Sequence, residues 1–213
     1  MKSLLIFTLT FAFGFLPILA NATTPKVGTV TVAIKDVFVK HHDDTEEKKV
    51  EIYSDVYLGD TFTTKDTESF VQIDFIDKTN ITMNGMDASL TIDEYVFDPS
   101  NLDAGTAKFS VLKGSFEFVG GLLDKGAGEN VQIDLDFGSI GVRGTKLYRS
   151  MKDGECWILL EDGDIRVFND GGEVFMKPGD GTRMGAKTKA PTPAKPWSQK
   201  NVEWIRGATS LPQ

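Results

Sequence analysis

Apolar and polar residues alternate with a period of two from residue 27 to about residue 176. Successive side chains of an extended strand point to opposite faces, so this pattern predicts half-buried β-strands. Between the alternating segments lie short runs of glycine, aspartate and proline, which adopt turn conformations that β-branched residues resist. The expected turns are at Gly59-Asp60, Asp98-Pro99, Asp162-Gly163, Asp170-Gly171-Gly172 and Pro178-Gly179-Asp180.

Many short alternating segments, closely spaced turns and no long helical pattern predict an all-β fold. We expect a single domain of many short strands, followed by a short C-terminal helical tail. The alternation does not select a topology. A sandwich, a solenoid-like stack and a barrel are all compatible with it.

Three local features are expected within this domain. Residues 71–83, VQIDFIDKTNITM, should form a hairpin around a polar turn. Lys113 and Gly114 should form another turn between two strands. The sequences GDTFTT at 59–64 and GDGTRM at 179–184 both follow an apolar stretch, which suggests one turn type used twice.

The N-terminal sequence MKSLLIFTLTFAFGFLPILANA has the parts of a secretory signal peptide. Lys2 is the charged start, an apolar run extends from Leu4 to Leu19, and Ala20 and Ala22 have the spacing of a cleavage site. We therefore expect a Sec-type signal peptide cut after Ala22, and a mature chain that is periplasmic or secreted. An uncleaved membrane anchor is the alternative, because the run has about the length of the shortest spanning helices.

Charge and cysteine content limit the classes of partner and the sources of stability. Without the predicted signal peptide, 22 basic and 31 acidic residues remain, a charge of −9. Such a surface repels nucleic acid and anionic membranes, so neither is an expected partner. Cys156 is the only cysteine, which excludes an intramolecular disulfide. Its apolar neighbours predict a core side chain, with a reactive thiol as the alternative.

The composition changes after residue 186. The sequence KTKAPTPAKPW is basic and proline-rich, as in an extended linker or an arm lying on the domain. Trp197 and Trp204 follow, seven residues apart, and Pro196 and Gly207 bound the pattern of a short amphipathic helix. We expect the two tryptophans either to pack on the β-domain or to contact another protein. The predicted boundaries are 1–22 for the signal peptide, 23–186 for the β-domain and 187–213 for the tail.

Few residues have an arrangement suited to catalysis or metal binding. His41 and His42 are the only histidines, and adjacent side chains on an extended backbone point apart, so a solvated loop tip is expected. Asp134 and Asp136 could bind calcium or flank a glycosidic bond, but alternation along a strand explains them equally. The sequence has no nucleophile elbow, zinc-protease motif or phosphate-binding loop. We therefore expect no enzymatic activity, no cofactor and no resident metal.

The segment GSIGVRGTKLY, residues 138–148, places one arginine among three glycines. Gly141 suggests a strand whose partner backbone comes close, and Gly144 permits a positive φ where the chain turns. Arg143 would lie at this corner, either as a structural clamp that bonds carbonyls or an acid, or as a group that binds an anionic ligand. Thr145 could close the turn through its hydroxyl. The candidate binding residues are therefore Arg143, Thr145, Trp197 and Trp204.

In this order, the segments resemble the FecR-domain family of bacterial envelope proteins. The motifs that carry the resemblance, over roughly residues 27–182, are VYLGDTFTT, VQIDFIDKTNITM, SLTIDEYVFDP, LKGSFEFV, GVRGT and LLEDGDIRVFNDGGEVFMKPGDG. One departure is DKTN at 77–80, where a glycine commonly follows the aspartate. The resemblance implies a periplasmic β-rich module. In the iron-uptake regulators that name the family, this module relays a signal from an outer-membrane transporter to a sigma factor.

The resemblance implies only part of that role. The regulators have a sigma-interacting segment before a spanning helix and a short secretin/TonB-type domain after the module, whereas this sequence is similar to the stand-alone secreted members. We therefore expect a non-enzymatic periplasmic protein-binding or scaffold module in envelope signalling or assembly, with an unidentified envelope protein as partner. Its expected contacts are exposed strand edges and the tryptophan tail. The competing hypothesis is a domain that binds a glycan, an iron chelate or calcium.

Overall fold

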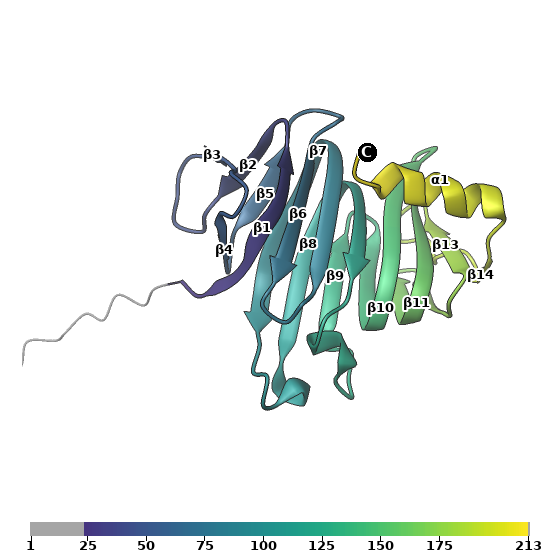
Figure 1. The fold of residues 1–213 in the computed structure, drawn as a ribbon. Helices are drawn as coiled ribbons and strands as arrows, with labels where there is room; N and C mark the ends of the chain where they lie inside the picture. The colour runs from purple at the N-terminus through teal and green to yellow at the C-terminus, as the bar shows by residue number, and fades with distance from the viewer. Residues whose placement is uncertain (1–23, 213) are drawn as a thin grey trace, which may run out of the picture.

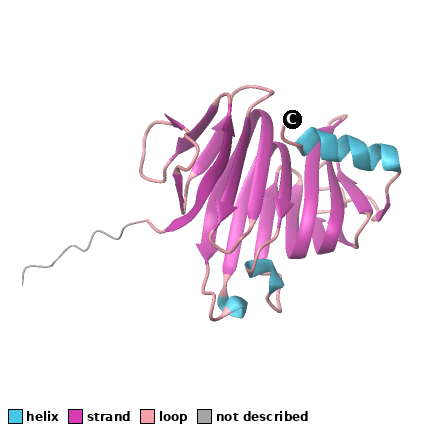
Figure 2. Cartoon of the chain, in the orientation of Figure 1, coloured by secondary structure: helices cyan, strands magenta, loops and turns pink. Residues whose placement is uncertain are grey.

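A computed structural model describes residues 24–212 of the 213-residue chain. These residues form one 14-stranded sheet, two short 3-10 helices and one α-helix (Figures 1 and 2). The elements are β1 (Lys26–Ile34), β2 (Val37–Lys40), β3 (Lys48–Lys49), β4 (Asp55–Tyr57), β5 (Thr61–Thr64), β6 (Phe70–Phe75), β7 (Asn80–Val96), η1 (Leu102–Ala104), β8 (Thr106–Val119), η2 (Leu123–Lys125), β9 (Val131–Leu135), β10 (Gly138–Lys152), β11 (Glu155–Asn169), β12 (Gly172–Met176), β13 (Asp180–Met184), β14 (Lys195–Pro196) and α1 (Gln199–Thr209).

The all-β prediction is therefore confirmed, as is the single short C-terminal helix. The predicted signal peptide lies outside the described residues. Within 24–212, no helix has the length and apolarity needed to cross a membrane.

The sheet folds over onto itself, and β8 shows this most directly. Phe109 and Phe118 are nine residues apart on this strand, which corresponds to about 30 Å in an extended chain. Their ring centroids nevertheless lie 6.5 Å apart. The two halves of β8 must therefore face each other across the interior.

Four long strands pass through both layers and change neighbours on the way. The first part of β7 pairs with β6 and its later part with β5. The first part of β8 pairs with β9 and its later part with β10. The first part of β10 pairs with β9 and its later part with β8. The first part of β11 pairs with β13 and its later part with β12. The result is a sandwich-like fold without a closed barrel, in which β7, β8, β10 and β11 connect the two layers.

Each of these strands bends at a glycine with positive φ. The corner residues are Gly85 (φ 110°), Gly114 (φ 84°), Gly144 (φ 63°) and Gly163 (φ 85°). Side chains other than hydrogen make this region costly, so glycine is the residue that permits the bend. The positive φ predicted for Gly144 is confirmed. The turn predicted at Lys113 and Gly114 is instead a bend within β8, so the sequence overestimated the number of short strands in this region.

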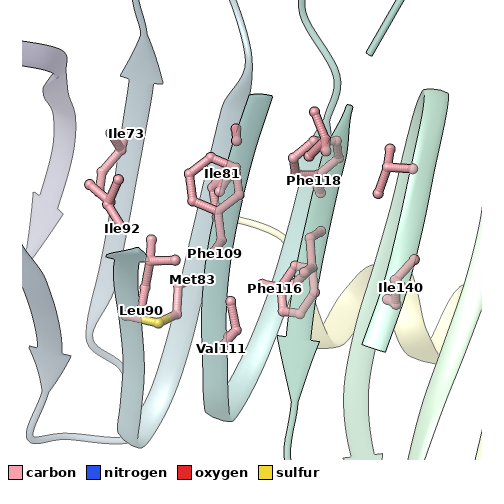
Figure 3. Packing of buried hydrophobic residues seen from close by; sticks show 14 of the residues in the cluster. Ile73, Ile81, Met83, Leu90, Ile92, Phe109, Val111, Phe116, Phe118 and Ile140 are labelled. Atoms are coloured by element: carbon pink, nitrogen blue, oxygen red, sulfur yellow. The ribbon is translucent and has the colours of Figure 1, made fainter. Parts of the chain in front are cut away.

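The core fills the space between the two layers (Figure 3). Its residues come from the alternating positions of every long strand. Phe75, for example, lies between the rings of Tyr95 and Phe109, at centroid distances of 5.5 Å and 5.1 Å. Burying a side chain of this size stabilises the fold by about 1.5–3 kcal/mol. The hairpin predicted at 71–83 forms between β6 and β7 and contributes Ile73, Ile81 and Met83 to the core.

The turn type expected at two places occurs at both. Asp60 accepts the backbone N–H of Tyr57 through Oδ2 at 2.9 Å, and its own N–H donates to the Tyr57 carbonyl at 3.2 Å. Asp180 makes the same two bonds with Lys177, at 3.0 Å and 2.9 Å. Each aspartate follows a glycine of positive φ, so the shared Gly-Asp sequence forms the same local structure.

The C-terminal tail packs on the domain. Arm residues 195–196 form β14 along β13, and α1 lies across the side of the sheet near β10 (Figure 1). Ile205 of α1 is fully buried, and Asn84 of β7 donates its side-chain amide to the Ala208 carbonyl at 3.0 Å. The predicted helix boundaries need correction, because Trp197 precedes the helix and Gly207 lies inside it.

Candidate functional site

Arg143 lies at the β10 corner and its side chain is exposed. Among the described residues, its guanidinium makes no hydrogen bond and no ion pair. The structural clamp predicted for Arg143 is therefore wrong.

A buried carboxylate holds this corner in place of the arginine. Asp124 of η2 accepts the backbone N–H of Thr145 at 2.9 Å. The Thr145 hydroxyl donates to the carbonyl of Asp164 across the corner at 3.4 Å, so it connects β10 to β11 and does not close its own turn. Asp124 is 1% exposed and its Oδ1 has no hydrogen-bond partner within residues 24–212. Burial raises the pKa of this carboxyl.

A second buried aspartate fastens the same loop from the other side. Asp77, in the DKTN turn, accepts hydrogen bonds from the Tyr95 hydroxyl at 2.6 Å and the Leu123 N–H at 3.2 Å. It also accepts the Thr79 hydroxyl at 2.8 Å. Asp77 therefore supplies the acceptors that hold this turn against β7 and the η2 loop.

On β10 it is Arg149, and not Arg143, that has a structural role, which the glycine pattern did not predict. It is 0% exposed and donates through Nη1 to the carbonyl of Gly114, the glycine at the β8 corner. Its Nε and Nη2 reach the sulfurs of Cys156 at 3.3 Å and Met151 at 3.4 Å, and its nearest acid is Asp136 at 3.9 Å. Cys156 is buried as predicted, and burial raises the pKa of its thiol.

A groove of about 360 Å³ lies beside Arg143. Its charged and aromatic lining residues are Glu129, Arg143, Asp164, Arg166, Phe175 and Lys177. Phe175 is 67% exposed and is the only exposed phenylalanine in residues 24–212. The groove therefore combines an exposed aromatic ring with the free guanidinium of Arg143.

One wall of the groove is fixed by an ion-pair network. Arg166 bonds Glu129 through Nε and Nη2, at 2.9–3.2 Å, and Glu173 through Nη1 at 3.2 Å. Glu129 reaches Arg166 across Gly141, where a Cβ atom would collide with the Glu129 carboxylate. Gly141 was expected to accommodate a close partner backbone, and it instead accommodates this side chain.

The other wall of the groove is a free strand edge. Within the described part of the chain, β12 pairs with β11 alone. The other edge strands are protected: β3 consists of two exposed lysines, β14 contains a proline, and β4 has three residues. In β12 neither charge nor proline blocks the central residues Val174 to Met176. This edge, together with the groove, is the candidate functional site, and we call it the β12 edge.

The two candidate tryptophans belong to a separate cluster. Trp197 and Trp204 pack on Trp157 of β11 at centroid distances of 5.0 Å and 5.6 Å. The Lys152 ammonium lies 4.7 Å and 4.6 Å above the rings of Trp157 and Trp204. Of the two alternatives for the tail, the structure shows packing on the domain.

The remaining candidate residues do not converge on a common ligand. Asp134 pairs with Lys108 at 2.9 Å, whereas Asp136 faces Arg149. His41 is not a fully solvated tip residue, because its Nδ1 lies 2.8 Å from the buried carboxylate of Asp60. Residues 24–212 contain no group of three or more histidine, cysteine, aspartate or glutamate side chains arranged to hold a metal ion.

The structure therefore describes an all-β module with one exposed, unprotected strand edge in residues 24–212. No protein-family model matches the sequence, and no curated protein matches it. Among solved structures, it is similar to a crystal structure designated a "putative anti-sigma factor" from Parabacteroides distasonis, with 13% identity, a TM-score of 0.50, and coverage of 69% of this chain and 64% of that chain. A second crystal structure of the same designation and organism has 13% identity, a TM-score of 0.49, and coverage of 67% and 63%. The first likeness shows a shared fold, and this chain spans 64% of that protein's length.

Proposed function

We propose that this chain is a non-enzymatic FecR-like module of the bacterial envelope that binds an extended segment of another envelope protein along the β12 edge. An added strand would pair with the free backbone groups of β12, with Phe175 and Arg143 contacting its side chains. The observation that carries the proposal is the unprotected edge of β12, which lies beside an exposed phenylalanine and an arginine that has no partner among residues 24–212. The periplasmic location follows from the predicted signal peptide and belongs to the proposal.

A role in envelope signalling agrees with the shared fold, because the similar solved structure is designated an anti-sigma factor. The ligand-binding alternative has less support. Asp134 pairs with Lys108 and Asp136 faces Arg149, so the two carboxylates do not share a site. The charged lining of the groove beside Arg143 is mixed, with two acids and three bases. We therefore place recognition in the β12 edge and do not assign a small-molecule site.

Photo-crosslinking in cells tests the proposal. A photoreactive phenylalanine at position 175 is expected to capture a specific envelope protein, and Glu173→Pro should reduce the capture because it removes a backbone donor from the edge. Tyr53, which is 79% exposed at the end of the molecule formed by β3 and β4, is the matched control position. Recognition by this edge would be refuted if positions 53 and 175 gave the same adducts. It would also be refuted if Glu173→Pro left the capture from position 175 unchanged.

A further inference from the structure

From the second residue of β12 to the residue after the strand, the sequence is Glu-Val-Phe-Met-Lys, residues 173–177. This segment has the same pattern in both directions: a charged residue at each end, an apolar residue inside each charge, and Phe175 in the middle. The two charges are opposite. We infer that the β12 edge pairs in antiparallel orientation with β12 of a second copy of this chain, around a two-fold axis at Phe175. The inference rests on the proposed function, which assigns this edge to protein recognition, and it names a second copy as one partner.

The backbone of β12 has the required polarity. Asn169 and Gly172 are paired across the two-residue turn that leads into β12, so they close the hairpin as a hydrogen-bonded pair. Alternate residues then bond β11, namely Gly172, Val174 and Met176. The N–H and C=O groups of Glu173 and Phe175 point to the open side. Two copies of Phe175 placed opposite each other would exchange both backbone hydrogen bonds.

Side chains on the outer face complement each other in this register. Centring on Phe175 places the two phenylalanine rings opposite each other and Glu173 opposite Lys177 of the second copy, twice by symmetry. Lys177 has no ion-pair partner among the described residues, and it lines the same groove as Phe175. Its backbone is held by Asp180 at the repeated turn, so its position at the end of the strand is fixed.

Neighbouring registers lack this match. Centring on Glu173 would place the two glutamates opposite each other, and like charges at directly opposed positions are destabilising. Centring on Val174 would use the same free backbone groups but would place Glu173 opposite Phe175 of the second copy, so neither Glu173 nor Lys177 would face an opposite charge. The register centred on Phe175 therefore combines free backbone groups with opposite charges.

The paired strands are short, and a five-residue edge buries less than the roughly 1,000 Å² typical of a stable interface. The association should therefore be weak, and cross-linking is the suitable measurement. The purified mature chain with Phe175→Cys is expected to form a disulfide-linked dimer at least ten times faster than Tyr53→Cys, the collision control, or Glu173→Cys, whose symmetry mate lies out of register. Cys156 is buried and does not compete.

Charge exchange tests the register. In the Phe175→Cys background, Lys177→Glu should slow cross-linking because it opposes Glu173, and the double change Glu173→Lys with Lys177→Glu should restore it. Phe175, Glu173 and Lys177 are exposed, and unchanged tryptophan fluorescence confirms folding of each variant. The inference would be overturned if Phe175→Cys cross-linked no faster than Tyr53→Cys. It would also be overturned if the double charge exchange cross-linked no faster than Lys177→Glu alone. This experiment contains only one protein, so its failure leaves the in-cell capture of another envelope protein intact as a separate test of the proposed function.

Discussion

Replacing Ile205 by alanine should loosen the docking of α1 on the sheet. Ile205 is 0% exposed and packs among Tyr148, Trp157 and Leu159. Truncating a fully buried isoleucine to alanine costs about 2–5 kcal/mol, depending on how well the surroundings close around the cavity. A single helix covers this cluster and can move inward, so we expect the lower part of the range, about 2–3 kcal/mol. That loss corresponds to a shift of roughly 30- to 150-fold in the docking equilibrium.

The effect should be local and easy to observe. An isolated helix of 11 residues is marginal in water, so α1 depends on its contacts with the sheet. All three tryptophans of the chain lie in this cluster, and their fluorescence therefore reports docking, whereas far-UV circular dichroism is dominated by the sheet. In a urea titration of Ile205→Ala, the red shift of tryptophan emission should precede the loss of sheet signal.

Glu203→Ala is the matched control, because Glu203 lies on the same helix with an exposed side chain. It should leave both transitions close to those of the unmodified protein. The reasoning would be refuted if Ile205→Ala left the midpoint of the fluorescence transition unchanged. It would also be refuted if Glu203→Ala shifted that midpoint equally.

Three further predictions concern the corners and the buried charges. Burial raises the pKa of the Asp124 carboxyl in the folded state, so the folded state loses stability as pH rises from the ordinary aspartate pKa through the raised pKa. Asp124→Asn should therefore gain stability relative to the unmodified protein as pH rises through this window, and a pH-independent difference in urea melts would contradict this. Gly144→Ala should cost about 1–2 kcal/mol from the positive φ alone. Gly163→Ala should cost more, because its Cβ would also collide with the Gly144 carbonyl, and equal thermal midpoints of the two variants would contradict this. The unfolding free energy of Arg149→Met should stay within about 1 kcal/mol of the unmodified protein, because a well-packed apolar side chain replaces a buried ion at little cost. Arg149→Ala leaves a cavity and should cost about 3 kcal/mol, and equal losses in the two urea midpoints would count against this reasoning.

Local sequence patterns predicted where most of the strands lie, but they did not predict where a strand bends and continues. Alternation located the strands because each has one face in the core, and Gly-Asp located the repeated turn because the aspartate side chain completes it. A glycine that ends one strand and a glycine that bends a continuing strand have the same local sequence. Gly114 was therefore assigned to a turn between two strands, although the chain continues through it into the other layer.

The two arginines of β10 show why the site could be predicted only in part. The glycines around Arg143 predicted a structural clamp, yet its side chain is exposed and makes no hydrogen bond or ion pair within the described chain. Arg149 shares the alternation of Leu147 and Met151, which places it on the core face, and this periodicity was the available signal. What the sequence could not supply was its acceptor, the Gly114 carbonyl, which is 35 residues away and becomes available only where β8 bends.

The glycines and the arginine of the GVRGT segment differ in what they contact. Gly141 makes room for Glu129 to reach Arg166, and Gly144 turns β10 into the other layer, so both glycines serve the fold. Arg143 lies between them with an exposed side chain. Phe175 reaches the same groove from β12. A corner required by folding thus exposes a cation next to the one unprotected strand edge of the described chain, which is why we assign recognition to this edge and not to the better-covered tryptophan cluster.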